Sequence, residues 1–173
     1  LCIEDLYLKK IKSFRIVNKY SIPTLEEILS LELDDLILNI ELKGKGTAIP
    51  TIEILRKYFK NKLLKEENIL ISSFDWDELL IFRSKSQKIP IAVLIDGNPL
   101  IALKFAEKVK AVAINSDYRF LNKSNVDLIN SKGYKLFPYT VNDEDQMMKL
   151  ISLGVDGIIT DYPDKLKNIL NYY

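Results

Sequence analysis

The sequence contains no histidine, and Cys2 is its only cysteine among 173 residues. Without histidine the chain has no His general base, no Ser-His-Asp or Cys-His catalytic arrangement and no His-ligated zinc site. A single cysteine excludes an internal disulfide and a cysteine metal cluster, which favours an intracellular and specifically a cytoplasmic location. These absences remove much familiar hydrolase chemistry from the chain taken by itself.

An excess of charge of one sign and long apolar runs are also missing. The 25 Lys and Arg residues nearly balance the 24 Asp and Glu residues, so a nucleic-acid partner, which calls for excess cation, is not expected. No apolar run approaches the ~20 residues of a membrane-spanning helix, so we expect no membrane span. The composition, 47% hydrophobic and 28% charged, is that of a globular protein. No linker-like segment divides the chain, which predicts one domain over residues 1–173.

Short apolar runs alternate with amphipathic segments along the chain. The runs are almost continuously apolar, as in strands of a parallel sheet that is covered on both faces, and they lie at 36–42, 69–72, 91–95, 111–115, 135–139 and 157–161. The predicted helices lie at 25–29, 52–59, 76–83, 100–109, 125–131, 144–153 and 164–170. Thr24, Thr51, Asp75, Ser124 and Asp143 are the expected residues before five of these helices.

Repeated strand and helix units fit either a doubly wound open sheet or a closed barrel, both of class α/β. The ends of the runs favour the barrel because they are polar, and in a parallel barrel all such ends meet on the face where sites are built. These residues are Glu41 and Lys43, Ser72 and Ser73, Asp96, Asn115 and Ser116, Thr140 and Asn142, and Thr160 and Asp161. Only six of the eight strands of a complete barrel are predicted, so two units are expected to be missing.

Five segments resemble, in order and spacing, the glycerophosphodiester phosphodiesterase family: IPTLEEIL (22–29), LNIELK (38–43), ISSF (71–74), YTVN (139–142) and GVDGIITDYP (154–163). The resemblance implies a TIM-like barrel that hydrolyses glycerophosphodiesters to glycerol phosphate and an alcohol. It also implies a divalent metal held by carboxylates and two histidines in acid and base roles. The His-Arg, Glu-x-Asp and His-Asp pieces of the family pattern are not in this sequence. Because the chain starts at Leu1 and not at Met, we expect them, with the first two strands, to lie upstream.

Carried over residue by residue, the resemblance assigns Glu41 as a ligand of Mg²⁺ or Ca²⁺, both of which prefer oxygen ligands. It assigns Lys43 to the phosphate, where its charge would stabilise the transition state and so make it a catalytic residue. Tyr139 stands where the family commonly has Trp and would contact the substrate, with simple packing as the alternative. Asn142 would bind substrate or orient the site, or else cap the next helix. Asp161 is expected to cap the final helix.

Two other functions remain open from the sequence. A noncatalytic truncated barrel could bind a phosphorylated ligand or a protein partner through Lys43 and the strand ends. An unrelated barrel enzyme could act on a sugar phosphate, although no Gly-rich phosphate loop follows the late strands. The favoured partner is a small-molecule glycerophosphodiester. The chain alone is expected to be inactive, and its unpaired sheet edges would favour a homo-oligomer if it acts by itself.

Overall fold

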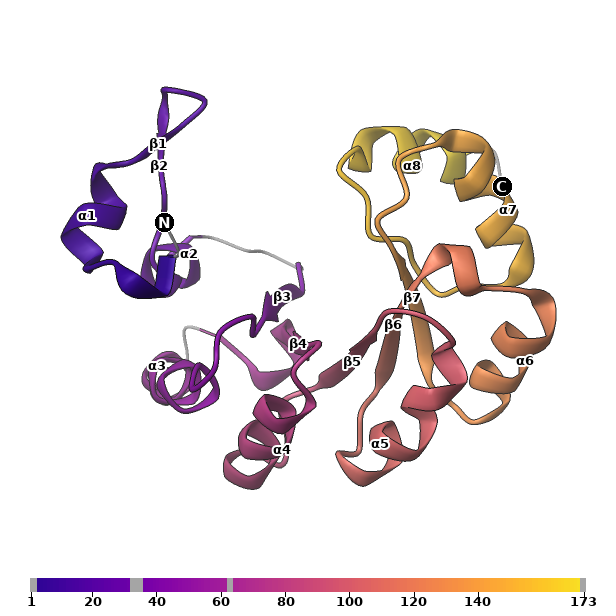
Figure 1. Ribbon diagram of the computed structural model, residues 1–173, viewed down its shortest axis with the longest axis horizontal. Coiled ribbons are helices and arrows are strands. Elements are labelled where there is room, and N and C mark those ends of the chain that lie inside the picture. Colours follow the sequence, from indigo (N-terminus) through magenta and orange to yellow (C-terminus); the bar gives the residue numbers. More distant parts are fainter. Residues whose placement is uncertain (1–2, 32–35, 62–63, 172–173) are drawn as a thin grey trace.

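The computed structural model describes residues 3–31, 36–61 and 64–171, so Cys2 lies outside the described residues. Its centre is a curled parallel sheet whose five strands lie side by side in chain order (Figure 1). The strands are β3 (Leu38–Glu41), β4 (Ile69–Ser73), β5 (Ile91–Ile95), β6 (Ala113–Asp117) and β7 (Lys135–Tyr139). This is the arrangement expected for part of a barrel of strand and helix units.

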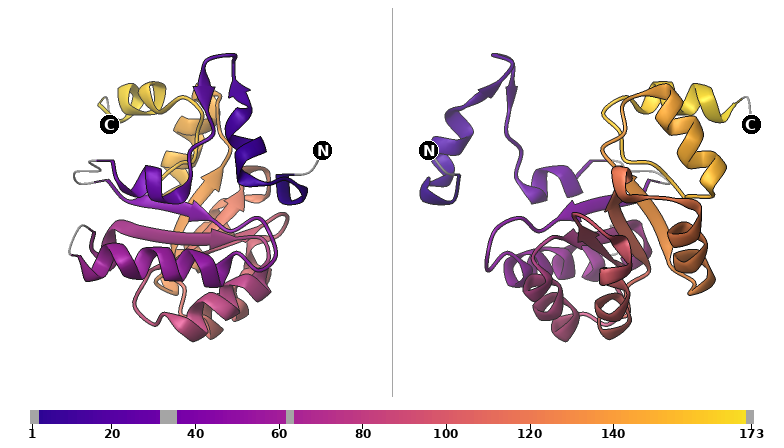
Figure 2. Two further views of the ribbon diagram at one scale, coloured as in Figure 1. Left: turned by 90° about the vertical axis from the view of Figure 1, so that its left-hand side faces the viewer. Right: turned by 45° about the vertical axis from the view of Figure 1, so that its right-hand side comes forward.

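Helices follow the strands and cover the convex face of the sheet (Figures 1 and 2). They are α3 (Ala48–Lys60), α4 (Trp76–Lys85), α5 (Ala102–Lys108), α6 (Lys123–Ser131), α7 (Glu144–Leu153) and α8 (Pro163–Leu170), with short 3-10 turns η2 (Glu66–Asn68), η3 (Pro99–Ile101) and η4 (Tyr118–Phe120). Ile71, Val93 and Ile114 are fully buried and belong to the core cluster that these helices share. The core therefore sits between the sheet and its outer layer of helices.

Alternate residues of each strand point to the concave face. The register places Glu41 beside Ser72, Leu94 beside Asn115, and Asp117 beside Tyr139. The Ser72 hydroxyl donates a hydrogen bond of 2.9 Å to the Asn39 side chain of the neighbouring strand. This face carries polar side chains at several levels, whereas the convex face is mostly apolar, with Ser73 and Ser116 as buried polar residues near its strand ends.

Residues 3–31 form an arm that extends to one side of the sheet (Figure 2). Its elements are η1 (Ile3–Asp5), α1 (Leu8–Ser13), the hairpin β1 (Arg15–Ile16) and β2 (Tyr20–Ser21), and α2 (Leu25–Leu29). The Tyr58 hydroxyl donates to the Glu26 carbonyl oxygen at 2.9 Å, which ties α2 to α3. Among the described residues of the arm only Leu29 is buried. No helix within the described ranges is long and apolar enough to cross a membrane.

The predicted ends of two helices are confirmed by local hydrogen bonds. Thr24 and Glu27 form the predicted capping box at the start of α2. The Asp143 side chain accepts a hydrogen bond from the Gln146 N–H at the start of α7, and Gly154 ends that helix in the left-handed conformation at φ 89°. These ends were visible in the sequence because each depends on residues within one turn.

Three predicted helix starts were wrong. Helix α5 begins at Ala102 and not at Leu100, because Pro99–Ile101 forms a 3-10 turn ahead of it. The third helix begins at Ala48, not after Thr51, because the buried Glu78 carboxylate of α4 accepts from the backbone N–H groups of Gly46 at 2.5 Å and Ala48 at 2.8 Å. The helix after β6 begins at Lys123, with Asn122 and not Ser124 as its cap. The start of α3 depends on a carboxylate of α4, so the residues around the start of α3 do not indicate it.

The predicted sixth strand, 157–161, is not a regular strand. Ile159 donates its N–H to the Pro138 oxygen and accepts from the Val141 N–H, both at 2.9 Å. Those two partners are three positions apart, so an extra residue interrupts the regular parallel pattern. The predicted strand at 111–115 is also shifted to Ala113–Asp117, because Ala111 N–H bonds back to Ala106 at the end of α5.

Candidate active site

Glu41 and Lys43 lie together at the carboxyl end of β3, as predicted. The Lys43 ammonium nitrogen is 3.8 Å from Glu41 Oε1, and the lysine side chain is 79% exposed while the glutamate side chain is 30% exposed. Leu42 between them is buried, and its N–H bonds to the Ser72 oxygen of β4 at 2.8 Å. The buried leucine anchors the backbone, so both charged groups are directed away from the helical core.

A divalent metal would need more oxygen ligands than this pair supplies. Among the described residues no three Asp, Glu, His or Cys side chains gather closely enough to hold a metal ion. Glu41 is a suitable single ligand for Mg²⁺ or Ca²⁺, but these ions take about six or more oxygen ligands. The described residues therefore do not form a metal centre by themselves.

Tyr139 closes the end of β7 with both its ring and its hydroxyl engaged. The hydroxyl donates to the Ile95 carbonyl oxygen at 2.9 Å. The ring meets the ring of Phe74 edge to face, with 5.6 Å between centroids. Burial first, and then the charges of Asp96 and Asp117, raise the pKa of Tyr139 to about 12. The phenol therefore stays neutral at ordinary pH and is fixed in place.

Asp117 and Arg119 form an ion pair at the end of β6 that the sequence reasoning missed. Arg119 Nε donates to both carboxylate oxygens at 3.0 and 2.9 Å, and its Nη2 donates to Oδ2 as well. These hydrogen bonds hold the pKa of Asp117 below its usual range, and the same hydrogen bonds, followed by the Asp117 charge, raise the pKa of Arg119. The available signal was an acidic residue two positions after the end of the predicted strand at 111–115, but that strand was placed two residues too early.

Asn142 links two segments, β7 and the irregular strand beside it. Its Nδ2 donates to Asp161 Oδ2 at 2.8 Å, and its Oδ1 accepts from the Asp161 N–H at 3.0 Å and the Thr160 hydroxyl at 3.1 Å. Asp161 therefore does not cap the last helix, contrary to prediction, and Tyr162 at that position makes no capping side-chain hydrogen bond. The geometry gives Asn142 an orienting role; its contact with substrate stays a prediction, as does that of Tyr139.

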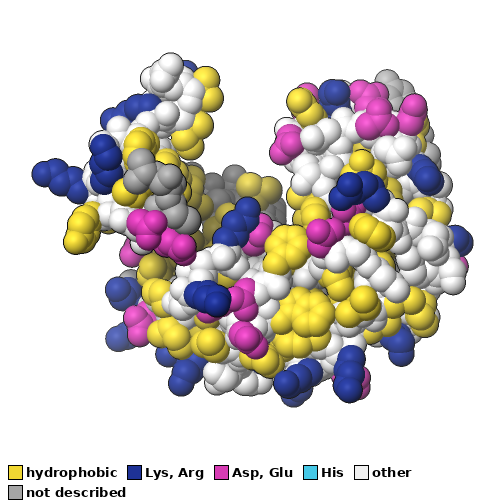
Figure 3. Space-filling view, in the orientation of Figure 1, with side chains coloured by type: hydrophobic (Ala, Val, Ile, Leu, Met, Phe, Trp, Pro, Cys, Tyr) yellow, Lys and Arg dark blue, Asp and Glu magenta, His cyan; other side chains and the backbone are white. Residues whose placement is uncertain are grey.

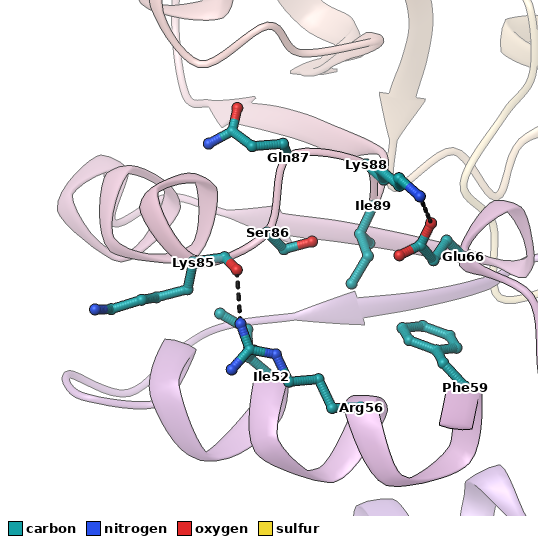
Figure 4. Close-up of a pocket in the computed structure, with 9 residues that line it drawn as sticks. All are labelled: Ile52, Arg56, Phe59, Glu66, Lys85, Ser86, Gln87, Lys88 and Ile89. Atoms are coloured by element: carbon teal, nitrogen blue, oxygen red, sulfur yellow. Dashed lines mark hydrogen bonds and ion pairs between the residues drawn. The ribbon is translucent and has the colours of Figure 1, made fainter. Parts of the chain in front are cut away.

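Two hollows lie apart from this strand-end cluster. One, of about 440 Å³, lies on the concave face, and the buried Asn115 amide that lines it has no hydrogen-bond partner among the described residues. The other, of about 270 Å³, lies between α3 and the segment after α4 (Figure 4). There Arg56 Nη2 donates to the Lys85 carbonyl oxygen at 2.8 Å and the Lys88 ammonium lies 3.9 Å from the Glu66 carboxylate, so three of the charged side chains already interact with the protein.

The chain matches sequences of known phosphodiesterases along most of its length. The glycerophosphodiester phosphodiesterase of Bacillus subtilis is 33% identical over 162 residues, which cover 88% of this chain and 55% of that protein. The glycerophosphodiester phosphodiesterase of Caldanaerobacter subterraneus is 31% identical over 183 residues, which cover 97% of this chain and 72% of that protein. The chain thus spans between about half and three quarters of the length of these two relatives.

Solved structures agree with the fold. An Oleispira antarctica phosphodiesterase in complex with its product sn-glycerol-3-phosphate matches with a TM-score of 0.84 at 23% identity, covering 98% of this chain and 72% of that one. A glycerophosphodiester phosphodiesterase from Thermotoga maritima matches with a TM-score of 0.67 at 27% identity, covering 88% and 65%. The curled sheet is thus part of a TIM barrel. With a family model matching residues 2–165, the chain belongs to the glycerophosphoryl diester phosphodiesterase family.

Proposed function

We propose that this chain forms the Glu41 and Lys43 part of an enzyme that hydrolyses glycerophosphodiesters to glycerol phosphate and an alcohol, with a divalent metal. The observation that carries the proposal is the close placement of this carboxylate and this ammonium at the carboxyl end of β3. The second support is that the chain belongs to a family in which the similar proteins named above are phosphodiesterases. The end of a barrel strand is where catalytic groups of such folds are found.

In this proposal Lys43 binds a non-bridging oxygen of the phosphodiester. Its charge offsets the charge of the diester and of the more negative transition state as water attacks phosphorus and the bond to the alcohol oxygen breaks. Glu41 supplies one oxygen ligand to Mg²⁺ or Ca²⁺, an ion that would act as a Lewis acid on the phosphate. No histidine exists among the 173 residues, so the proton transfers assigned to the family's histidines need groups outside this sequence.

The test joins this chain to the amino-terminal strand and helix units of the Bacillus subtilis relative. We expect the chimera to hydrolyse a glycerophosphodiester with loss of activity in EDTA, and the chain alone to show no turnover. Lys43→Met should reduce kcat/KM of the chimera by about 100-fold or more, as expected for loss of a transition-state charge contact. Glu53→Gln on the outer helix α3 is the matched control and should leave the rate unchanged.

The second candidate is a noncatalytic barrel that binds a phosphorylated ligand. It is favoured by the lack of histidine and by the lack of a three-ligand metal group within the described residues. A folded chimera that binds glycerol 3-phosphate through Lys43 but never hydrolyses a diester would support this candidate over the enzyme.

A further inference from the structure

The strand ends carry charges of both signs separated by aromatic rings. Lys43 lies at the end of β3, Asp96 follows β5, and the rings of Phe74 and Tyr139 come from the ends of β4 and β7. On the face of the molecule that Figure 3 shows, hydrophobic side chains likewise lie between side chains of Lys, Arg, Asp and Glu. A ligand with a negative and a positive group could match this order of charges.

Most carboxylates at the strand ends already have partners. Asp117 is held by Arg119, Glu41 lies 3.8 Å from Lys43, and Asp161 accepts from Asn142. Asp75 accepts from two backbone N–H groups at the start of α4. Asp96 differs, because its exposed side chain makes no hydrogen bond or ion pair within the described ranges. Its charge acts on Arg119 and Tyr139 without a direct contact, so a carboxylate with no hydrogen bond or ion pair within the described ranges lies near the aromatic pair.

The aromatic pair is fixed and partly open to solvent. Phe74 is 48% exposed, although its ring packs edge to face on Tyr139. The Tyr139 hydroxyl is held by the Ile95 carbonyl oxygen, and Ile95 directly precedes Asp96. The hydrogen bond therefore keeps the rings next to the segment that carries the Asp96 carboxylate. An aromatic face beside a carboxylate is the chemistry that recognises an ammonium group.

We propose that Phe74, Tyr139 and Asp96 form a subsite for a cationic headgroup, so that the preferred substrates are zwitterionic glycerophosphodiesters whose alcohol carries an ammonium. This inference rests on the proposed function, which places the phosphate at Lys43. The headgroup cation then lies against Phe74 and Asp96, and Tyr139 holds the Phe74 ring in position. Diesters with a neutral alcohol, such as glycerol, gain no binding affinity from these three residues.

The test measures binding by calorimetry to the chain itself, with glycerophosphocholine and glycerophosphoglycerol as probes. We expect glycerophosphocholine to bind about three- to tenfold more tightly, the range expected for a solvent-accessible cation–π contact with one nearby carboxylate. Asp96→Asn and Phe74→Leu should each remove most of that preference without changing the affinity for glycerophosphoglycerol. Lys43→Met should weaken both diesters, and Glu53→Gln should weaken neither.

The outcomes separate the two proposals. Equal affinity for the two diesters, unchanged by Asp96→Asn, would overturn the cationic subsite and leave the proposed function standing. Absence of binding of either diester, together with an inactive but folded chimera, would overturn the proposed function and the subsite with it. The same comparison of kcat/KM in the chimera provides a second readout, because the subsite must favour the choline diester in turnover as well.

Discussion

At the scale of single residues, the sequence located the charged pair but not its surroundings. Glu41 and Lys43 could be found because they are two positions apart at the end of one strand and stand in a recognisable segment. The roles of Tyr139 and Asn142 could not be resolved, since their partners Ile95 and Asp161 are 44 and 19 positions away. Side chains that contact distant backbone are placed only by the tertiary fold.

Tyr139→Phe tests the anchoring of the aromatic pair. Loss of the hydrogen bond to Ile95 should lower the free energy of unfolding by about 1 kcal/mol near neutral pH. The pKa of Tyr139 is raised to about 12, so the unfolded chain loses this proton first as pH rises. The stabilisation from the phenol is therefore present below about pH 10 and is lost as pH approaches 12.

The measurement is urea unfolding of both proteins between pH 8 and 12, followed by circular dichroism. The difference in unfolding free energy between the native protein and Tyr139→Phe should shrink across the upper part of this range. A difference that stays constant to pH 12 would show that the phenol is not held as described.

At the scale of elements, the strands were predicted better than the helix starts. Apolar runs gave β5 and β7 with their correct bounds. β5 is buried on both faces and so has a continuous apolar pattern, whereas β7 begins at the exposed Lys135 and is only partly buried on one face. The hairpin of β1 and β2 was not predicted. Its turn uses Val17 and Asn18 at φ 52° and 56°, and a β-branched residue with positive φ gives no turn signal. The early start of α3 was equally hidden, because Glu78 comes from the next helix.

Glu78→Gln tests this long-range cap. The amide retains one acceptor oxygen for two N–H groups and lacks the charge that favours a helix start, so we expect a loss of about 1–3 kcal/mol in unfolding free energy. Glu53→Gln makes the same chemical change at an exposed position of α3 and should stay within about 0.5 kcal/mol of the native value. Chemical denaturation of the three proteins checks this, and equal stability of all three would refute the cap.

At the scale of the whole molecule, a concave face with a hollow and a buried amide is the feature least visible in the sequence. Asn115 is fully buried, and neither Nδ2 nor Oδ1 has a hydrogen-bond partner among the described residues. The sequence pattern predicts a polar strand end at this residue, whereas Asn115 stands in the middle of β6. Its surroundings depend on how far the sheet curls, which no local pattern records.

Asn115→Leu should stabilise the chain by about 1–2 kcal/mol, since it removes a buried polar group that lacks partners and keeps a similar volume. Asn125→Leu is the matched comparison: that buried amide accepts from Asn122 N–H and donates to the Phe120 oxygen, so its loss should destabilise by about 1–3 kcal/mol. Thermal unfolding of both variants distinguishes the two amides. Destabilisation by Asn115→Leu as well would mean that Asn115 has partners in solution.

The order of the sheet has a consequence for how the molecule folds. Each strand from β4 to β7 pairs with the strand that precedes it in the chain, and within the described residues none of these strands pairs across a longer separation. Each such pairing joins strands that are only one strand-and-helix unit apart in the chain, so each new unit can dock as soon as it is complete. A ribosome would release these units in the same order in which they pair, which favours vectorial growth of the sheet during synthesis.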